Sequence, residues 1–140
     1  MSADLIVGID PGVHTGFAQW DRKAKCFIAV LSMPAALALW RVQEMKKADL
    51  VHMVVFEDAR LRTGYFGPRA AHNAQGAGSI KRDCQLWAEW LGLLELPYRT
   101  VSPKHKGKKM GADAFARLTG WQGRTNEHAR DAAALVWGMN

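Results

Sequence analysis

Short apolar runs alternate with amphipathic stretches along this chain, a pattern that predicts a mixed α/β fold. Runs rich in β-branched residues predict strands over 4–10, 14–20, 25–31, 51–57 and 98–101. Apolar positions at helical spacing predict helices over about 34–47, 79–94, 110–118 and 126–139, with a glycine- and arginine-rich loop over 59–78. Three strands in series, followed by alternating helices and strands, predict one mixed five-stranded sheet flanked by helices. No repeat or linker divides the chain, so we expect a single domain over 1–140.

The first apolar run ends in a carboxylate and then turns sharply at Asp10-Pro11-Gly12. Thr15-Gly16-Phe17-Ala18 then reads as the returning strand, which predicts a tight hairpin between the two runs. The sheet would hold Asp10 at the tip of a buried strand while its carboxylate faces solvent, a suitable position for a metal ligand. The alternative is that Asp10 only caps the turn, as Asp-Pro pairs often do.

Two further polar sites favour the metal interpretation. The apolar run 51–56 ends in Glu57, and the last predicted helix carries polar residues in its first turn. There His128 and Asp131 are three residues apart and Glu127 and Asp131 are four apart, so each pair shares a helix face. Acidic residues in a first turn also complement the helix dipole. As a set, these sites predict two-metal phosphoryl transfer, in which Mg²⁺ ions are held by carboxylates and substrate phosphate.

These motifs resemble the RuvC-type Holliday junction resolvases of the RNase H-like superfamily. The resemblance lies in Gly8-Ile9-Asp10-Pro11-Gly12 with 15–18, in Phe56-Glu57 as the second acidic site, and in 129–134 as the helix with the last aspartate. It implies an RNase H-like α/β fold in which Mg²⁺ or Mn²⁺, two ions per active site, is held by Asp10, Glu57, His128 and Asp131. The family usually has Asp-x-x-Asp on this helix, whereas this chain has His128-x-x-Asp131, so Glu127 is an alternative ligand.

The net charge of +6 and the isoelectric point near 9.6 favour a polyanionic partner. Aromatic residues in the basic loop after Glu57 can stack on unpaired bases, or can fold back onto the core. The resemblance implies that one of them wedges into the centre of a junction, and that lysines after strand 98–101 approach the scissile phosphate. A lysine run is otherwise a solvated loop. The expected DNA contacts are Arg60, Arg62, Tyr65, Phe66, Arg69, Lys81, Arg82, Lys104, Lys106, Lys108 and Lys109.

The helix over 79–94 carries one apolar stripe, formed by Ile80, Cys84, Trp87, Leu91 and Leu94. The helix carries more apolar side chains than a single core-facing stripe requires, namely Trp87, Trp90 and Leu91. We expect this group to form core and part of the interface of a C₂ homodimer. Cys26 and Cys84 show no metal-ligand spacing and are expected to be reduced core residues.

Three other features concern the environment of the protein. No apolar run approaches the ~20 residues of a membrane span, and no signal peptide pattern begins the chain, so we expect a cytoplasmic protein. The chain is compact for the family, which favours a phage or mobile-element source. His14, beside Asp10 in the hairpin, either lines the site or is incidental.

The most economical hypothesis is a metal-dependent endonuclease that resolves Holliday junctions and other branched DNA by paired phosphodiester hydrolysis. One alternative is another RNase H-like nuclease, acting on flaps or RNA–DNA hybrids. The other is a catalytically inactive junction-binding protein, for which His128 is the indication.

Overall fold

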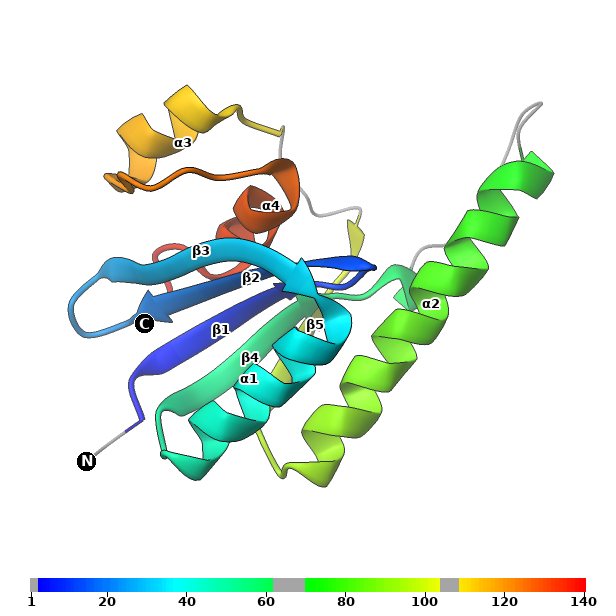
Figure 1. Cartoon of the computed structure of the whole chain (residues 1–140), viewed down its shortest axis with the longest axis horizontal. Coiled ribbons are helices and arrows are strands. Elements are labelled where there is room, and N and C mark those ends of the chain that lie inside the picture. The colour runs from blue at the N-terminus through cyan, green and yellow to red at the C-terminus, as the bar shows by residue number, and fades with distance from the viewer. Residues whose placement is uncertain (1–2, 62–69, 104–108) are drawn as a thin grey trace.

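The computed structural model describes the backbone of residues 3–61, 70–103 and 109–140, and side chains over the same ranges except 70–77. Figure 1 shows a central sheet with helices on both faces. The strands and helices, in chain order, are β1 (Leu5–Asp10), β2 (His14–Asp21), β3 (Cys26–Pro34), α1 (Ala35–Lys47), β4 (Val51–Glu57), η1 (Ala59–Leu61), α2 (Ala70–Leu93), β5 (Tyr98–Val101), α3 (Ala112–Thr119) and α4 (Glu127–Val136).

The five strands form one sheet in the order β3-β2-β1-β4-β5. β1 pairs antiparallel with β2, and β2 with β3, whereas β1–β4 and β4–β5 are parallel. The predicted mixed five-stranded sheet of an α/β fold is therefore confirmed. None of the helices in the described ranges is long and apolar enough to span a membrane.

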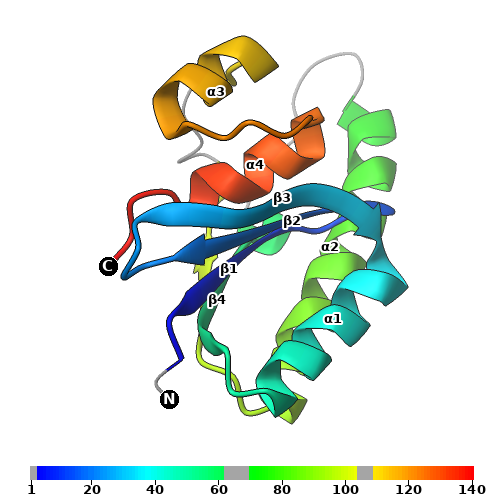
Figure 2. The same cartoon turned by 60° about the vertical axis from the view of Figure 1, so that its left-hand side comes forward.

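Each face of the sheet has its own core. Val7, Ile9 and Phe17 belong to a cluster shared with α1 and α2, whereas Ile6 and Ala18 belong to a cluster shared with α4. This division follows from strand geometry, because successive side chains point to opposite faces. Figure 2 shows α1 and α2 on one side of the sheet and α4, with α3 beside it, on the other.

Three element boundaries differ from the prediction by three residues or more. α2 begins at Ala70 rather than near Ser79, because the alanines of 70–77 favour a helix strongly enough to offset the cost of about 1 kcal/mol per glycine. β3 continues to Pro34, where ψ is 146° and the backbone is still extended. α4 ends at Val136, because the chain turns at Trp137 and Gly138 adopts a positive φ of 79°.

The predicted stripe of α2 is partly confirmed. Cys84, Trp87 and Leu91 are fully buried, but Ile80 is 44% exposed and faces solvent. Trp87 and Leu91 therefore form the core part of the predicted group, and neither side chain is available to a subunit interface. Cys26 is exposed at the start of β3, which corrects its prediction as a core residue.

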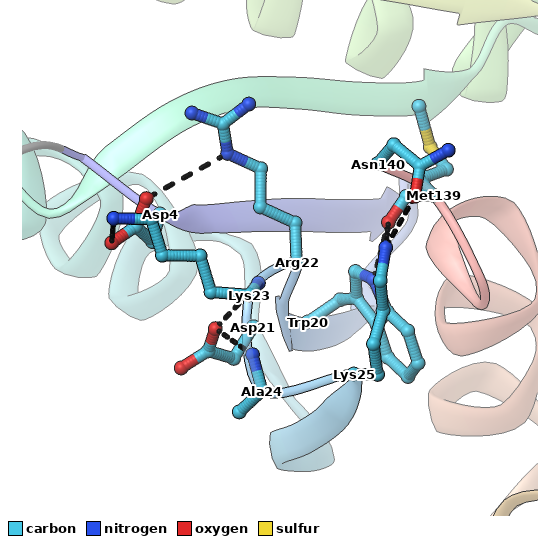
Figure 3. A network of polar contacts seen from close by, with 9 residues as sticks. All are labelled: Asp4, Trp20, Asp21, Arg22, Lys23, Ala24, Lys25, Met139 and Asn140. Atoms are coloured by element: carbon cyan, nitrogen blue, oxygen red, sulfur yellow. Dashed lines mark hydrogen bonds and ion pairs between the residues drawn. The ribbon is translucent and has the colours of Figure 1, made fainter.

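The end of the chain is held against the β2–β3 turn, as Figure 3 shows. The Trp20 indole N–H donates to the carbonyl oxygen of Met139 at 2.9 Å, and the Lys25 ammonium donates to the same oxygen at 3.4 Å and to the Asn140 side chain. At the same end of the sheet, Asp4 forms ion pairs with the β2–β3 turn. These contacts lie at the far end of β2 from His14, so they do not take part in the candidate site.

Candidate functional site

Strand register brings the two strand-end carboxylates to the same level. The parallel β1–β4 ladder pairs Ile9 with Phe56, so Asp10 and Glu57 are the next residues on adjacent strands, about 4.8 Å apart in the sheet. Ile9 and Phe56 point into the α1/α2 core. Because side chains alternate along a strand, Asp10 and Glu57 point to the opposite face, which α4 covers.

Two glycines allow α4 to lie directly on that face. A Cβ at Gly16 would lie 2.0 Å from the carbonyl oxygen of His128, and a Cβ at Gly8 would lie 2.3 Å from that of Ala132. Gly16 is also the cross-strand partner of Asp10. The absence of a side chain at these two positions therefore lets the first turn of α4 approach the end of β1.

The start of α4 is set by a local cap. The Asn126 side-chain oxygen accepts a hydrogen bond from the backbone N–H of Ala129 at 2.9 Å, the usual arrangement at a helix N-terminus. Its side-chain nitrogen donates to the Ser32 hydroxyl, which ties the cap to β3. The cap orients the residues that follow, so that His128 meets Asp10.

His128 is the residue of α4 that lies against Asp10. Its Nδ1 is 3.7 Å from Asp10 Oδ2, while the Asp10 side chain is 15% exposed and the His128 side chain is 49% exposed. A second imidazole, that of His14, has its centroid 6.1 Å from that of His128. The structure therefore places His128 beside this carboxylate and His14 beside His128. Sequence reasoning singled out only His128 as a ligand.

Lys109 lies on the acidic side of α4. Its Nζ is 3.6 Å from Asp131 Oδ2, and it forms an ion pair with Glu127. The Asp131 side chain is 14% exposed and that of Glu127 is 58% exposed. Glu127 is thus directed to Lys109 and solvent, and His128 is the better candidate to complete a site with Asp10.

The donor set fits a divalent cation. Three carboxylates, Asp10, Glu57 and Asp131, supply the oxygen ligands that Mg²⁺ and Mn²⁺ prefer. Two ligands of one ion, each at about 2.1 Å, lie about 3–4 Å from each other, and the His128–Asp10 separation of 3.7 Å falls in this range. Within the described part of the chain, however, no three His, Cys, Asp or Glu side chains already converge on one point, so their present contacts would have to change when a cation binds.

Arg60 forms a contact that sequence reasoning missed. Its Nε and Nη2 donate to Asp58 Oδ1 and Oδ2 at 2.9 and 2.8 Å, and its backbone N–H also donates to Oδ1 at 3.0 Å. Asp58 is only 2% exposed. Burial acts to raise the pKa of this carboxyl, but the hydrogen bonds from Arg60 outweigh it and the pKa is lowered. The pair fixes the backbone directly after Glu57.

We expect Asp58→Asn to lower the free energy of unfolding by about 2 kcal/mol at neutral pH, since a hydrogen bond to a charged group contributes about 1.5–3 kcal/mol. Because the pKa of Asp58 is lower in the folded state than in the unfolded state, where it is about 4, the ionised carboxyl stabilises the fold at pH values above about 4. This stabilisation is lost as the pH falls through the pKa of Asp58 in the folded state. The difference between the two proteins, measured by urea denaturation, should therefore shrink progressively as the pH falls below about 4. Asp113→Asn, on α3, is the control, and a pH-independent difference would contradict this assignment.

The remaining candidate DNA contacts fall into two groups. Lys81 is half-buried on α2 and Arg82 is exposed there, while Lys109 lies at Asp131. Outside the described residues lie Arg62, Tyr65, Phe66, Arg69, Lys104, Lys106 and Lys108. These residues belong to two segments, 62–69 and 104–108. The first segment comes after η1, which follows β4, and the second comes after β5, which pairs with the end of β4. The last described residues before both segments therefore follow the end of the sheet that carries Glu57.

The sheet order and the two helical layers define an α/β fold of the RNase H-like type. Among solved structures, Thermus thermophilus RuvC in complex with a Holliday junction substrate superposes with a TM-score of 0.60 at 15% identity, over 96% of this chain and 90% of that one. A second Thermus thermophilus RuvC structure gives 0.52 at 15% identity, over 96% and 92%. No family model and no curated protein matches the sequence. The RuvC-like fold expected from the motifs is thus confirmed.

Proposed function

We propose that this protein is a divalent-metal-dependent endonuclease that cleaves branched DNA, with four-way (Holliday) junctions as its substrate. The observation that carries this proposal is that Asp10 and Glu57 end adjacent strands at one level, with His128 of α4 lying against Asp10. Asp10 and Glu57 share a level and a face, and α4 adds His128 and Asp131 on that face. The solved neighbour with a Holliday junction substrate supports the choice of substrate.

In the proposed mechanism, four residues share the role of metal ligand and other contacts hold these ligands in position. Asp10, Glu57, Asp131 and His128 would hold Mg²⁺ or Mn²⁺, two ions per site, which when bound supply an activated water and stabilise the leaving oxygen. The β1–β4 pairing keeps Asp10 and Glu57 at one level, so both carboxylates face the same phosphate. The close packing at Gly16 holds His128 in position. The Asp58–Arg60 pair keeps the end of β4 rigid.

The positive charge of the chain supports a nucleic-acid substrate. A net charge of +6 coexists with the acidic residues of the site, and Lys109 lies directly beside them. Lysine acts as a point charge towards phosphate. In the proposed complex, Lys109 contacts the DNA backbone next to the cleaved bond, and the basic segments 62–69 and 104–108 recognise the shape of the junction.

We expect Lys109→Met to weaken junction binding and to strengthen metal binding. The ammonium lies 3.6 Å from Asp131 Oδ2, so its removal leaves a more negative site for a cation. An exposed ion pair is worth up to about 1 kcal/mol, which corresponds to about a fivefold change in affinity. Mn²⁺ titration calorimetry and junction fluorescence anisotropy measure the two effects. Lys47→Met, which removes an ion pair with Glu44 on α1, should change neither, and unchanged affinities in Lys109→Met would contradict the proposed contact.

The proposed function includes a homodimer. A four-way junction is cut on two symmetrically placed DNA strands, and the two cuts require two active sites. The Trp90 indole joins α2 to α1 by donating to the carbonyl oxygen of Leu39 at 3.0 Å. Next to this contact, Trp40 is 56% exposed and Leu93 is 78% exposed. We propose that these two side chains, rather than the buried Trp87, form the subunit contact.

Leu93→Asp is expected to shift the protein from dimer to monomer, since a charge would be buried at the contact. Sedimentation equilibrium at several protein concentrations measures the shift. Leu118→Asp, at a 49% exposed position of α3, is the matched control and should remain dimeric. A Leu93→Asp protein that sediments as the wild type does would place the contact elsewhere.

The proposed activity is tested with a labelled four-way junction in Mg²⁺ or Mn²⁺, beside matched duplex, flap and RNA–DNA hybrid substrates. Paired nicks in the junction alone are expected. Preferred cutting of the flap or the hybrid would identify a different RNase H-like nuclease. Tight junction binding without cleavage in either metal would identify a binding protein that lacks turnover.

A further inference from the structure

His14 lies on the same face as the candidate site, and the register of β2 explains why. Gly16 pairs with Asp10, and Ala18 and Trp20 belong to the α4 core. His14 precedes Gly16 by two residues and therefore points to that same face. It is the first residue of β2 and is exposed, so its imidazole lies on this face of the sheet but outside the buried core.

Three elements thus place two imidazoles and one carboxylate at one end of the sheet, with His128 as the residue that neighbours both His14 and Asp10. β2 provides His14, β1 provides Asp10 and α4 provides His128. His128 Nδ1 is 3.7 Å from Asp10 Oδ2, and the two imidazole centroids are 6.1 Å apart, with their planes inclined by 32°. The other half of the site differs, because Asp131 and Glu127 offer only oxygen atoms, in contact with Lys109.

We propose that His14 is a further metal-binding residue, and that together with His128 it makes the Asp10 half of the site selective for Mn²⁺ over Mg²⁺. This inference rests on the proposed function, since it concerns the same metal site. Mg²⁺ is bound almost entirely by oxygen and loses its water reluctantly. Mn²⁺ also prefers oxygen ligands but, as a first-row transition-metal ion, it accepts imidazole more readily than Mg²⁺ does, so each added imidazole favours Mn²⁺ over Mg²⁺.

His14 has the freedom that this role requires. Its side chain is exposed at the start of β2, so a change of its side-chain rotamer displaces no buried residue. Thr15, the next residue, is buried and donates its hydroxyl hydrogen to the carbonyl oxygen of Gly12 at 2.7 Å. The backbone that carries His14 is therefore held in place while its imidazole moves.

The first experiment measures metal affinity in the absence of DNA. Isothermal titration of the metal-free full chain with Mn²⁺ and with Mg²⁺ gives a ratio of dissociation constants. His14→Asn is expected to weaken Mn²⁺ binding about tenfold and to leave Mg²⁺ binding within about twofold. His52→Asn, in the half of β4 remote from Glu57, is the matched control and should leave the ratio unchanged.

The second experiment identifies the ligand atoms. Electron spin-echo modulation from imidazole nitrogen in the Mn²⁺ complex should be present in the wild type and reduced in His14→Asn. It should persist in His128→Asp, where His14 is the remaining imidazole of the site. His14→Gln serves as a second variant if His14→Asn fails to fold, as judged by circular dichroism.

The outcomes separate this inference from the proposed function. An unchanged Mn²⁺ to Mg²⁺ ratio in both His14 variants, with junction cleavage intact, would overturn the role of His14 alone. Nitrogen modulation that vanishes completely in His128→Asp would do the same. A wild-type protein that binds neither metal would instead overturn the proposed metal-dependent activity itself.

Discussion

Asp10→Asn is expected to abolish cleavage of a four-way junction while leaving binding of the junction intact. Asparagine keeps the size of the side chain but removes the charge, at a position that is level with Glu57 and 3.7 Å from His128. A metal ion contributes several kcal/mol of transition-state stabilisation, and each 1.36 kcal/mol is tenfold in rate. We therefore expect single-turnover cleavage to fall by about 10³-fold or more.

Two measurements make this result specific. Fluorescence anisotropy should show junction affinity within about threefold of the wild type, or tighter, since a negative charge beside the phosphate is removed. Asp113→Asn, which removes an acid from the first turn of α3, should cleave normally. Cleavage by Asp10→Asn at the wild-type rate would show that Asp10 only caps the β1–β2 turn.

Gly16→Ala is expected to destabilise the protein by about 3 kcal/mol or more, the upper range for overpacking of a well-packed interior. The added Cβ would lie 2.0 Å from the carbonyl oxygen of His128 and 3.0 Å from the Cβ of Asp10. The obstacle is backbone rather than a flexible side chain, so α4 must move away from β2. Urea denaturation measures the loss, and cleavage should fall as well because His128 moves with the helix.

The control for this variant is Gly92→Ala on α2, where an added Cβ meets no atom within 4 Å. Alanine is favoured over glycine in a helix by about 1 kcal/mol, so Gly92→Ala should leave stability unchanged or raise it slightly. Equal destabilisation by both variants would show that the close approach of α4 at Gly16 is not what limits the fold.

Some differences between the predicted and observed elements have a local cause. The glycines of 70–78 suggested a loop, but the alanines among them extend α2 to Ala70. The third predicted strand ends at residue 31, but Ser32 lies in β3 and its hydroxyl accepts a hydrogen bond from Asn126. In both cases a few residues favoured the end of an element, and the conformational preference of the neighbouring residues outweighed them.

In the candidate site, some features could be predicted from the order of residues and others only from the folded structure. That Asp10 and Glu57 end apolar runs, and that His128 and Asp131 are three apart on a helix, is visible in the order of residues. The selection of His128 rather than Glu127 beside Asp10 is not, because Glu127 is held by Lys109. The Asp58–Arg60 pair was also missed, since a spacing of two residues indicates a contact only when the backbone is known to turn there.

The sequence by itself determined the elements and the chemistry that each one carries. Hydrophobic periodicity depends only on neighbours along the chain, so the five strands, the acidic strand ends and the polar first turn of α4 were accessible from it. Only the tertiary structure decided which of these groups meet. Asp10 and His128 are more than a hundred residues apart in the chain, and their contact depends on strand register and on the packing of α4 against Gly8 and Gly16. Register and close packing are properties of the whole folded chain, and no local pattern encodes them.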